Sequence, residues 1–239
     1  MATPPDTAST SSGVKRQSAP RRRSADGGRS SRRSFNSRRH ILDAAAHLFS
    51  SQGYSATTLR QVATKARIKA GSIYYHFDSK EQIMAEVLSI AVRITHDSVK
   101  QAVDALPPDA SHQRRVEMAI RTHLLILHRH RRYTAANVRF HGQVPRRVDR
   151  LVQGARDAYS AYWNTLLRQA QEAGEIRSDF SLSVLRLFIL GSLNRTVEWV
   201  NPRKGPIERL ADQYVAVFLE GMGRLPRCGP ERRGIKESV

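Results

Sequence analysis

The stretch between residues 69 and 80 carries the side chains best suited to bind an anion. It contains two lysines, a serine, a histidine and a pair of tyrosines, namely Lys69, Ser72, Tyr74, Tyr75, His76 and Lys80. Ammonium, hydroxyl and imidazole groups donate hydrogen bonds to phosphate oxygens, which is one way proteins hold a nucleic-acid backbone. The other interpretation is a helical corner whose polar face is only solvated. The elements around this stretch help to decide between the two.

Two short helices are predicted here, over 58–66 and 70–76, joined by a turn of about three residues. The first opens with a capping box that runs from Thr58 to Gln61, in which both side chains satisfy N–H groups at the start of the helix. In a helix-turn-helix unit the first helix supports the second, which lies in the major groove of DNA. The spacing therefore favours DNA reading over a merely solvated corner.

Other constellations that could do chemistry are incomplete in this sequence. His123, His128 and His130 suggest a metal site, but no carboxylate or cysteine completes a ligand set at zinc spacing. A glycine-rich phosphate loop, a nucleophile elbow and a paired carboxylate motif are also missing from the sequence. We therefore predict no catalytic residue, no metal and no cofactor, and a protein that is not an enzyme.

The charge of the chain indicates a polyanionic partner. There are 40 Lys and Arg against 21 Asp and Glu, a formal net charge of +19, which favours nucleic acid and, less strongly, an anionic membrane surface. Apolar stretches are interrupted by charges and no apolar secretory core begins the chain, so we predict no membrane partner. The single cysteine, Cys228, excludes an intrachain disulfide, and we predict a cytoplasmic, nucleoid-associated protein.

Between two basic tails the sequence predicts an all-α fold of about nine helices. Residues 1–35 are rich in Ser, Arg, Pro and Gly and are expected to be disordered. This tail could add non-specific attraction to phosphates, be an organelle transit peptide, or be an inert leader. Residues 224–239 are expected to form a flexible basic tail. Apolar residues between the tails recur at helical spacing, and no segment alternates as a half-buried strand would.

At this point the sequence resembles a known family. The stretches from Gly53 to Ala66 and from Gly71 to Glu81, with their Tyr-Tyr-His-Phe run, are similar to the signature of the tetracycline-repressor (TetR) family over about residues 37–90. The resemblance implies a helix-turn-helix DNA-binding domain over 36–82 and a ligand-binding and dimerisation domain over 83–223. It also implies operator DNA, a second copy of the chain and a small-molecule effector as partners.

The resemblance also assigns roles to individual residues of the DNA-binding unit. It implies that Thr58 caps the supporting helix against a phosphate and that Arg60 reaches a base. The side chains closest to the base edges would be Ala70, Gly71 and Ser72, and those contacting the backbone Tyr74, Tyr75, His76 and Lys80. Two positions depart from the family pattern: Arg67 replaces a glycine, and Lys69 replaces the serine that caps the recognition helix. We expect Lys69 either to contact a phosphate or to leave that helix uncapped.

Two apolar stripes predict how the chain dimerises. They fall on the last two predicted helices, at Leu182, Leu185, Phe188, Ile189 and Leu193 and at Leu210, Tyr214, Val217 and Phe218. We interpret them as a two-helix face that forms a four-helix bundle with its copy. The alternative is a monomer core, since stripes at helical spacing are usually core.

The end of the second domain resembles a subset of TetR-family regulators that bind acyl-CoA thioesters. Trp199 ahead of a Pro and Gly turn carries the likeness, although Arg195 and Val200 depart from the subset's pattern. An aromatic tunnel with arginines at its mouth would suit such a ligand. The candidate ligand-binding residues are Phe140, Arg146, Arg147, Arg150, Tyr159, Trp163, Asn194 and Trp199. Ordinary core aromatics and a solvated arginine face are the alternatives.

The sequence thus predicts a repressor that binds palindromic operator DNA as a dimer and is released by an effector, with an acyl-CoA thioester as the candidate. An effector-independent DNA-binding protein or an activator is the alternative suggested by the basic tails. A third hypothesis is an enzyme or small-molecule carrier whose helix-turn-helix is vestigial.

Overall fold

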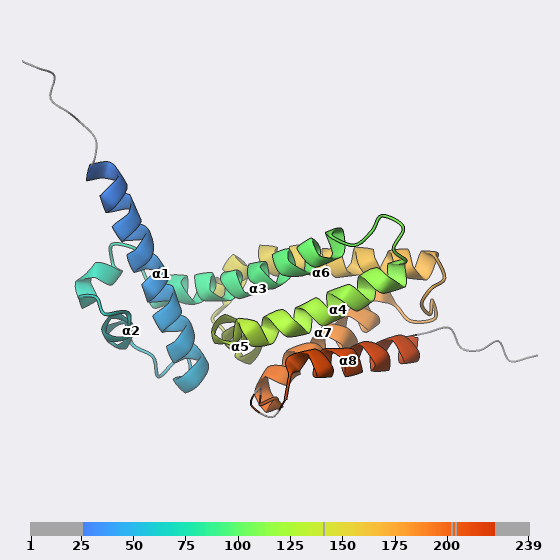
Figure 1. Cartoon of the computed structure of the whole chain (residues 1–239). Coiled ribbons are helices and arrows are strands. Elements are labelled where there is room, and N and C mark those ends of the chain that lie inside the picture. Colours follow the sequence, from blue (N-terminus) through green and yellow to red (C-terminus); the bar gives the residue numbers. More distant parts are fainter. Residues whose placement is uncertain (1–25, 141, 202, 204, 223–239) are drawn as a thin grey trace, which may run out of the picture.

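The protein folds into eight α-helices and one short 3-10 helix, with no strand among the described residues. The computed structural model describes residues 26–222 except 141, 202 and 204, and for residues 26–35 the backbone alone. The elements in Figure 1 are α1 (Asp26–Gln52), α2 (Leu59–Ala66), η1 (Ala70–Ile73), α3 (Lys80–Asp104), α4 (His112–Arg129), α5 (Arg131–Arg139), α6 (Arg146–Glu172), α7 (Leu182–Trp199) and α8 (Ile207–Met222). The prediction of an all-α fold is confirmed.

The first helix is longer than the sequence pattern indicates. α1 begins at Asp26, within the segment 1–35 expected to be a disordered tail. Extending an existing helix fixes one residue for each hydrogen bond gained, so a helix nucleated by its buried half can continue into a polar segment. Residues 1–25 and the predicted tail 224–239 lie outside the described residues.

The α2 helix forms where its capping residues predict it. The Thr58 side chain accepts from the Gln61 backbone N–H at 3.2 Å, and the Gln61 side chain accepts from the Thr58 backbone N–H at 2.8 Å. The helix ends at Arg67, whose φ of 58° and ψ of 42° place it in the left-handed region. Among the described residues Arg67 alone is a non-glycine with positive φ, and a side chain there costs about 1 kcal/mol or more.

The helix predicted over 70–76 is shorter and tighter in the structure. It is a 3-10 helix of four residues, Ala70–Ile73. Lys69 precedes it in extended conformation and its side chain makes no capping hydrogen bond. Without a side-chain acceptor the first N–H groups of a helix are left to short-range backbone bonds: Ser72 N–H donates to the Lys69 carbonyl at 2.9 Å. The predicted α-helical recognition element is therefore corrected to a 3-10 turn.

A small apolar core holds the N-terminal helices together. It joins α1, α2, η1 and the residues before α3 through side chains that are at most 1% exposed: Ile41, Phe49, Val62, Ile73 and Phe77. Burying a side chain of this size contributes roughly 1.5–3 kcal/mol. These residues fix the orientation of η1 against α1.

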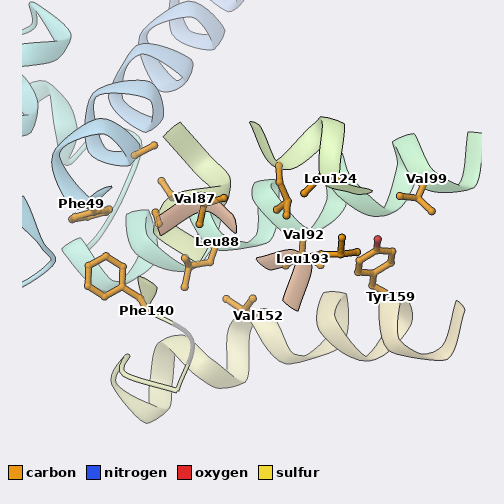
Figure 2. Packing of buried hydrophobic residues seen from close by; sticks show 14 of the residues in the cluster. Phe49, Val87, Leu88, Val92, Val99, Leu124, Phe140, Val152, Tyr159 and Leu193 are labelled. Atoms are coloured by element: carbon orange, nitrogen blue, oxygen red, sulfur yellow. The ribbon is translucent and has the colours of Figure 1, made fainter. Parts of the chain in front are cut away.

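The remaining helices form a bundle around α3. That helix packs against α4 and α6, while α7 packs against α6 and α8 against α4, as the side-by-side ribbons of Figure 1 show. Figure 2 shows the interior, where Val92 of α3, Val152 of α6 and Leu193 of α7 meet. One core therefore runs from α1 to α7, and α3 belongs to both halves of it.

The two halves are also joined by polar contacts that end on α1. Arg38 of α1 forms an ion pair with Glu86 of α3. The Tyr133 hydroxyl of α5 donates to the Asp43 carboxylate at 2.7 Å. Arg139, at the end of α5, donates to the Ser50 carbonyl near the end of α1 at 3.1 Å. The short α5 helix thus links the position of α1 to the bundle.

The left-handed residue after α2 gives a stability prediction. Arg67→Gly should raise the free energy of unfolding by up to about 1 kcal/mol, because glycine adopts positive φ without Cβ strain. In a chain of this length such a gain corresponds to roughly 2–4 °C in Tm. Thermal unfolding followed by circular dichroism checks it, with Lys65→Gly at an exposed helical position in the last turn of α2 as a control that should be destabilising. A lower Tm for Arg67→Gly would contradict the assigned strain.

Candidate nucleic-acid interface and ligand site

The residues predicted to contact DNA form a largely exposed surface over α2 and η1. Arg60, Lys69, Ala70, Gly71 and Ser72 are exposed, as is Thr58. Tyr74 and Tyr75 are 62% and 80% exposed, which is unusual for such large side chains. Ile73 and Phe77, between and after them, are buried. The apolar pair thus anchors the turn and leaves its polar and aromatic side chains in solvent.

Gly71 has no structural need to be glycine within the protein itself. Its backbone is not in the positive-φ region, and a Cβ built on it would meet nothing within 4 Å. The missing side chain therefore leaves this part of the surface open to close approach by another molecule. The ring of Tyr75 lies edge-on to the His76 ring, with 5.2 Å between their centroids. This contact holds His76 half-buried beside the exposed tyrosine.

Lys80 is held by the protein in a way that the sequence did not reveal. Its Nζ donates to the carbonyls of Tyr54 and Thr57, both at 3.0 Å, and lies 4.2 Å from the centroid of the Tyr54 ring. The ammonium thus joins the start of α3 to the loop before α2. Two of its three N–H donors are used here, so the predicted phosphate contact has one donor left.

The ring of Tyr54 is fixed from its other end as well. Its hydroxyl donates to the Glu81 carboxylate at 3.1 Å. Burial, together with this neighbouring carboxylate, raises the pKa of Tyr54 to about 12, so the phenol stays protonated and remains the donor. Tyr54, Lys80 and Glu81 together fix the loop that leads into the capping box of α2.

Of the predicted ligand-site residues, three are buried in the bundle. Phe140 is 8% exposed, Tyr159 7% and Trp163 0%; Figure 2 shows Tyr159 facing the interior that Val92 and Leu193 line. The others lie at the surface. The arginines at the start of α6, Arg146, Arg147 and Arg150, are exposed, and Trp199 at the end of α7 is 60% exposed.

The surface arginines and the buried aromatic residues are therefore separated along α6. From Arg146 to Tyr159 the rise of an α-helix covers roughly 20 Å. The structure thus does not bring these two sets into one compact site. A short tunnel with arginines at its mouth would require them to lie close together. Asn194 is half-buried and lines a hollow of about 530 Å³ with Arg139, Gln143 and Gly191.

A buried chain of polar side chains crosses the bundle at Tyr159. The Tyr159 hydroxyl lies 2.7 Å from Nδ1 of His123, and Nε2 of His123 lies 3.2 Å from Oδ1 of Asn194. Burial lowers the pKa of His123 to about 4, so its ring is neutral near pH 7. Because Oδ1 can only accept, Nε2 carries the proton and Nδ1 accepts from Tyr159.

His123 is the member of this hydrogen-bonded network that the sequence analysis missed. The sequence offered it only as a rejected metal ligand, and its partners are 36 and 71 residues away. Spacing along one chain could not have grouped them. Beside this network, the Tyr162 hydroxyl is buried and makes no hydrogen bond to any described residue. The Trp163 Nε1–H also lacks a partner within hydrogen-bond geometry, but the Trp163 side chain lies close enough to the Tyr159 hydroxyl to favour its ionised form. An unpaired buried donor costs about 1–3 kcal/mol.

The apolar stripes predicted on the last two helices divide into two faces. Leu185, Ile189 and Leu193 are at most 4% exposed and belong to the core of the single chain. An outer face remains in solvent, where Val184, Leu187 and Phe188 of α7 and Val217 of α8 are 56–67% exposed. The core interpretation therefore holds for the inner face, and the dimer interpretation stays a prediction for the outer face, which is exposed in the single chain.

The described part of the chain lacks two further classes of site. None of its helices has the length and apolar character needed to span a bilayer. No group of three or more His, Cys, Asp or Glu residues there is placed to hold a metal ion.

Comparisons with known proteins agree with this geometry. One family model, described as bacterial regulatory proteins of the tetR family, matches residues 41–87, and a second, described as a tetracyclin repressor-like C-terminal domain, matches residues 109–222. The transcriptional repressor KstR2 of Mycolicibacterium smegmatis is 29% identical over 192 residues, which are 77% of this chain and 90% of that protein.

Solved structures show the same fold. The ketosteroid regulator KstR2 of Mycobacterium tuberculosis is 26% identical with a TM-score of 0.65, over 79% of this chain and 95% of that one. AibR, solved in complex with isovaleryl coenzyme A and operator DNA, is 22% identical with a TM-score of 0.68, over 76% and 97% of the two chains. The named relatives are transcriptional regulators rather than enzymes.

The contacts of Lys80 predict a structural role that can be measured. Lys80→Ala should lower the free energy of unfolding by about 1.5–3 kcal/mol, because charge-assisted hydrogen bonds to two carbonyls are lost. Lys69→Ala, an exposed lysine in the same basic surface, is the matched control and should stay within about 0.5 kcal/mol of the parent. Urea unfolding monitors both variants. Equal stability of the two would show that the Lys80 contacts contribute nothing.

Proposed function

The chain belongs to the TetR family of bacterial transcriptional regulators, and from this premise we propose that it is a repressor released from DNA by a small-molecule effector. In this proposal it binds palindromic operator DNA as a homodimer at the nucleoid, in the cytoplasm. The observation that carries the proposal is the exposed polar surface over α2 and η1, anchored from behind by Ile73 and Phe77. Its effector would be an acyl-CoA thioester.

The proposed DNA contacts divide into base reading and backbone binding. The short side chains of Ala70, Gly71 and Ser72 allow η1 to approach base edges closely, and Arg60 of α2 would reach a base. Thr58, Lys69, Tyr74, Tyr75, His76 and the remaining donor of Lys80 would contact phosphates. Because η1 is only one short turn, the contact surface of one chain is small and reads a half-site.

The outer face of α7 and α8 supports the proposed homodimer. Its exposed apolar residues lie one turn apart on α7, and Gly191 lies on the next turn, where a missing side chain allows close approach of a second helix. Two such helices from each chain would bury this face in a four-helix bundle. A two-fold axis through this bundle would place two η1 surfaces on one palindrome.

The buried donors of α6 support the proposed effector. Trp163 Nε1–H and the Tyr162 hydroxyl would donate to the carbonyl oxygen of an acyl group, and the apolar surroundings would hold its chain. In a CoA thioester a long pantetheine arm separates that carbonyl from the nucleotide phosphates. The separation along α6 between Trp163 and the exposed Arg146, Arg147 and Arg150 therefore suits a thioester better than a compact ligand. AibR was solved with such a ligand.

The contacts of α5 offer a route from effector to DNA. Arg131 donates to the carbonyls of Val197 and Val200 at the end of α7, at 2.6 and 3.0 Å. The other side of α5 holds α1 through Tyr133 and Arg139. A ligand that displaces the end of α7 would therefore move α5 and α1 together, and so change the separation of the two η1 surfaces.

An effector-independent DNA-binding protein or an activator is the competing function, and its basis is the strong basic charge of the whole chain. Such a protein would bind DNA in a salt-dependent manner that is indifferent to sequence. The buried unpaired donors favour the ligand-released repressor, because they have no use in an effector-independent binder.

The dimer can be tested on the outer face. Phe188→Glu should make the protein monomeric and reduce operator affinity by at least tenfold, because a charge would be buried in the four-helix interface. Leu151→Glu, on the exposed side of α6 at 58% exposure, introduces the same charge elsewhere and should leave both properties unchanged. Light scattering after size exclusion and fluorescence anisotropy with operator DNA measure the two effects. A dimeric Phe188→Glu protein would refute the assigned interface.

The effector can be tested by operator release. Acyl-CoA thioesters should release the protein from DNA at concentrations at least tenfold below those of the matching free acids. Trp163→Phe removes the indole N–H but keeps an aromatic ring, and it should weaken the thioester response by about five- to tenfold, consistent with one hydrogen bond of about 1 kcal/mol. Phe180→Leu, at a 39% exposed aromatic residue outside the proposed ligand contacts, is the control. Equal potency of acid and thioester would remove the case for the nucleotide contacts.

A further inference from the structure

A hollow of the described surface lies where α1, α3 and α5 meet. It has a volume of about 810 Å³ and is lined by the middle of α1, the first turns of α3, and the end of α4 with the start of α5. In Figure 1, α2 and η1 lie on one side of α1 and α5 lies on the other. None of the residues that line the pocket belongs to α2 or η1. It also contains neither Tyr159 nor Trp163, so it is separate from the proposed acyl site.

The side chains that line this pocket carry far more positive than negative charge. Six arginines line it against two carboxylates. The carboxylates are already used: Glu86 is paired with Arg38, and Asp43 accepts from Tyr133. Arg131 is held by backbone carbonyls at the end of α7. The other four arginines have no hydrogen bond or ion pair to any described residue: Arg39, Arg93, Arg129 and Arg132.

Uncompensated guanidinium groups around one hollow create a positive potential that an anion would relieve. Guanidinium groups bind phosphate oxygens in bidentate fashion, so phosphate is the best-matched anion. The four arginines come from four elements, since Arg39 is on α1, Arg93 on α3, Arg129 at the end of α4 and Arg132 on α5. They could therefore surround a ligand with more than one phosphate.

The floor of the pocket is apolar. Leu42 is buried, Ile90 and Ile94 are half-buried, and the Tyr133 ring lies beside them. A simple inorganic ion would leave this surface uncovered. A phosphorylated molecule with an apolar or ring-shaped body would cover the floor and place its phosphates among the arginines.

We propose that this pocket is a second ligand site, which binds a phosphorylated small molecule with a ring-shaped body. The site goes beyond the proposed acyl effector, because its residues and its chemistry differ from those around Trp163. An occupant would touch α1, α3 and α5 at once and so stabilise the position of the DNA-binding helices relative to the bundle. Its binding would thereby couple to DNA affinity without the acyl site.

Isothermal titration calorimetry with adenosine diphosphate, pyrophosphate and adenosine, at constant ionic strength, tests the proposal. The full chain should bind adenosine diphosphate. It should bind pyrophosphate with lower affinity than adenosine diphosphate, and adenosine with an affinity at least tenfold lower than adenosine diphosphate. The double variant Arg93→Gln/Arg129→Gln should weaken adenosine diphosphate binding at least tenfold, and Arg132→Gln on a different helix should weaken it severalfold. The control Arg168→Gln/Arg209→Gln removes the same charge from exposed positions of α6 and α8 that belong to no proposed site, and it should change affinity by less than twofold.

Three results would overturn the proposal. The first is no binding of adenosine diphosphate at millimolar concentration, and the second is equal weakening in the pocket and control variants. The third is that the chain does not bind adenosine diphosphate, while Arg93→Gln/Arg129→Gln loses more affinity for non-specific duplex DNA than the control does. That result would assign the arginines to nucleic acid. These assays measure binding directly, so their outcome is independent of whether acyl-CoA releases the operator.

Discussion

The structure depends most on the continuity of α3. Its first turn is fixed to the DNA-binding unit, where Lys80 binds two carbonyls of the loop before α2 and Glu81 accepts from Tyr54. Its later turns supply Val87, Leu88 and Val92 to the core of the bundle. Because an α-helix is stiff over this length, the orientation of the helix-turn-helix and the packing of the bundle cannot vary independently. The regulator thus has one rigid axis through both halves.

The contacts that can adjust are those of α5 with α7 and α1, and they lie outside α3. The α5 helix holds the end of α7 through Arg131 and the end of α1 through Arg139, in each case by a guanidinium on backbone carbonyls. Such contacts can shift by small distances without opening the apolar core. In a ligand-controlled DNA-binding protein, small changes in the bundle must reach α1. Helix α3 is fixed in both halves, and the contacts of α5 connect the end of α7 to α1.

The interior of the bundle combines satisfied and unsatisfied polar groups within a few side chains. The side chains of His123, Tyr159 and Asn194 satisfy one another's hydrogen bonds, and the low pKa of His123 keeps this network neutral. The adjacent donors of Tyr162 and Trp163 have no described partner. A core optimised only for stability would not retain them, because their desolvation is uncompensated. These donors are the observation on which the proposed effector site rests.

The amino-acid sequence by itself determined the local elements. The capping box of Thr58 and Gln61 and the all-helical fold follow from hydrogen bonds and apolar spacing within a few residues, and these signals lie in consecutive positions. The family signature likewise depends on a contiguous stretch. Only the tertiary structure decided that Lys80 binds carbonyls, that α7 divides into an inner and an outer face, that Arg146 lies far from Tyr159, and that four unpaired arginines surround one pocket. The physical reason is that these contacts join residues tens of positions apart, and which of many similar side chains meet depends on how whole helices pack rather than on any local pattern.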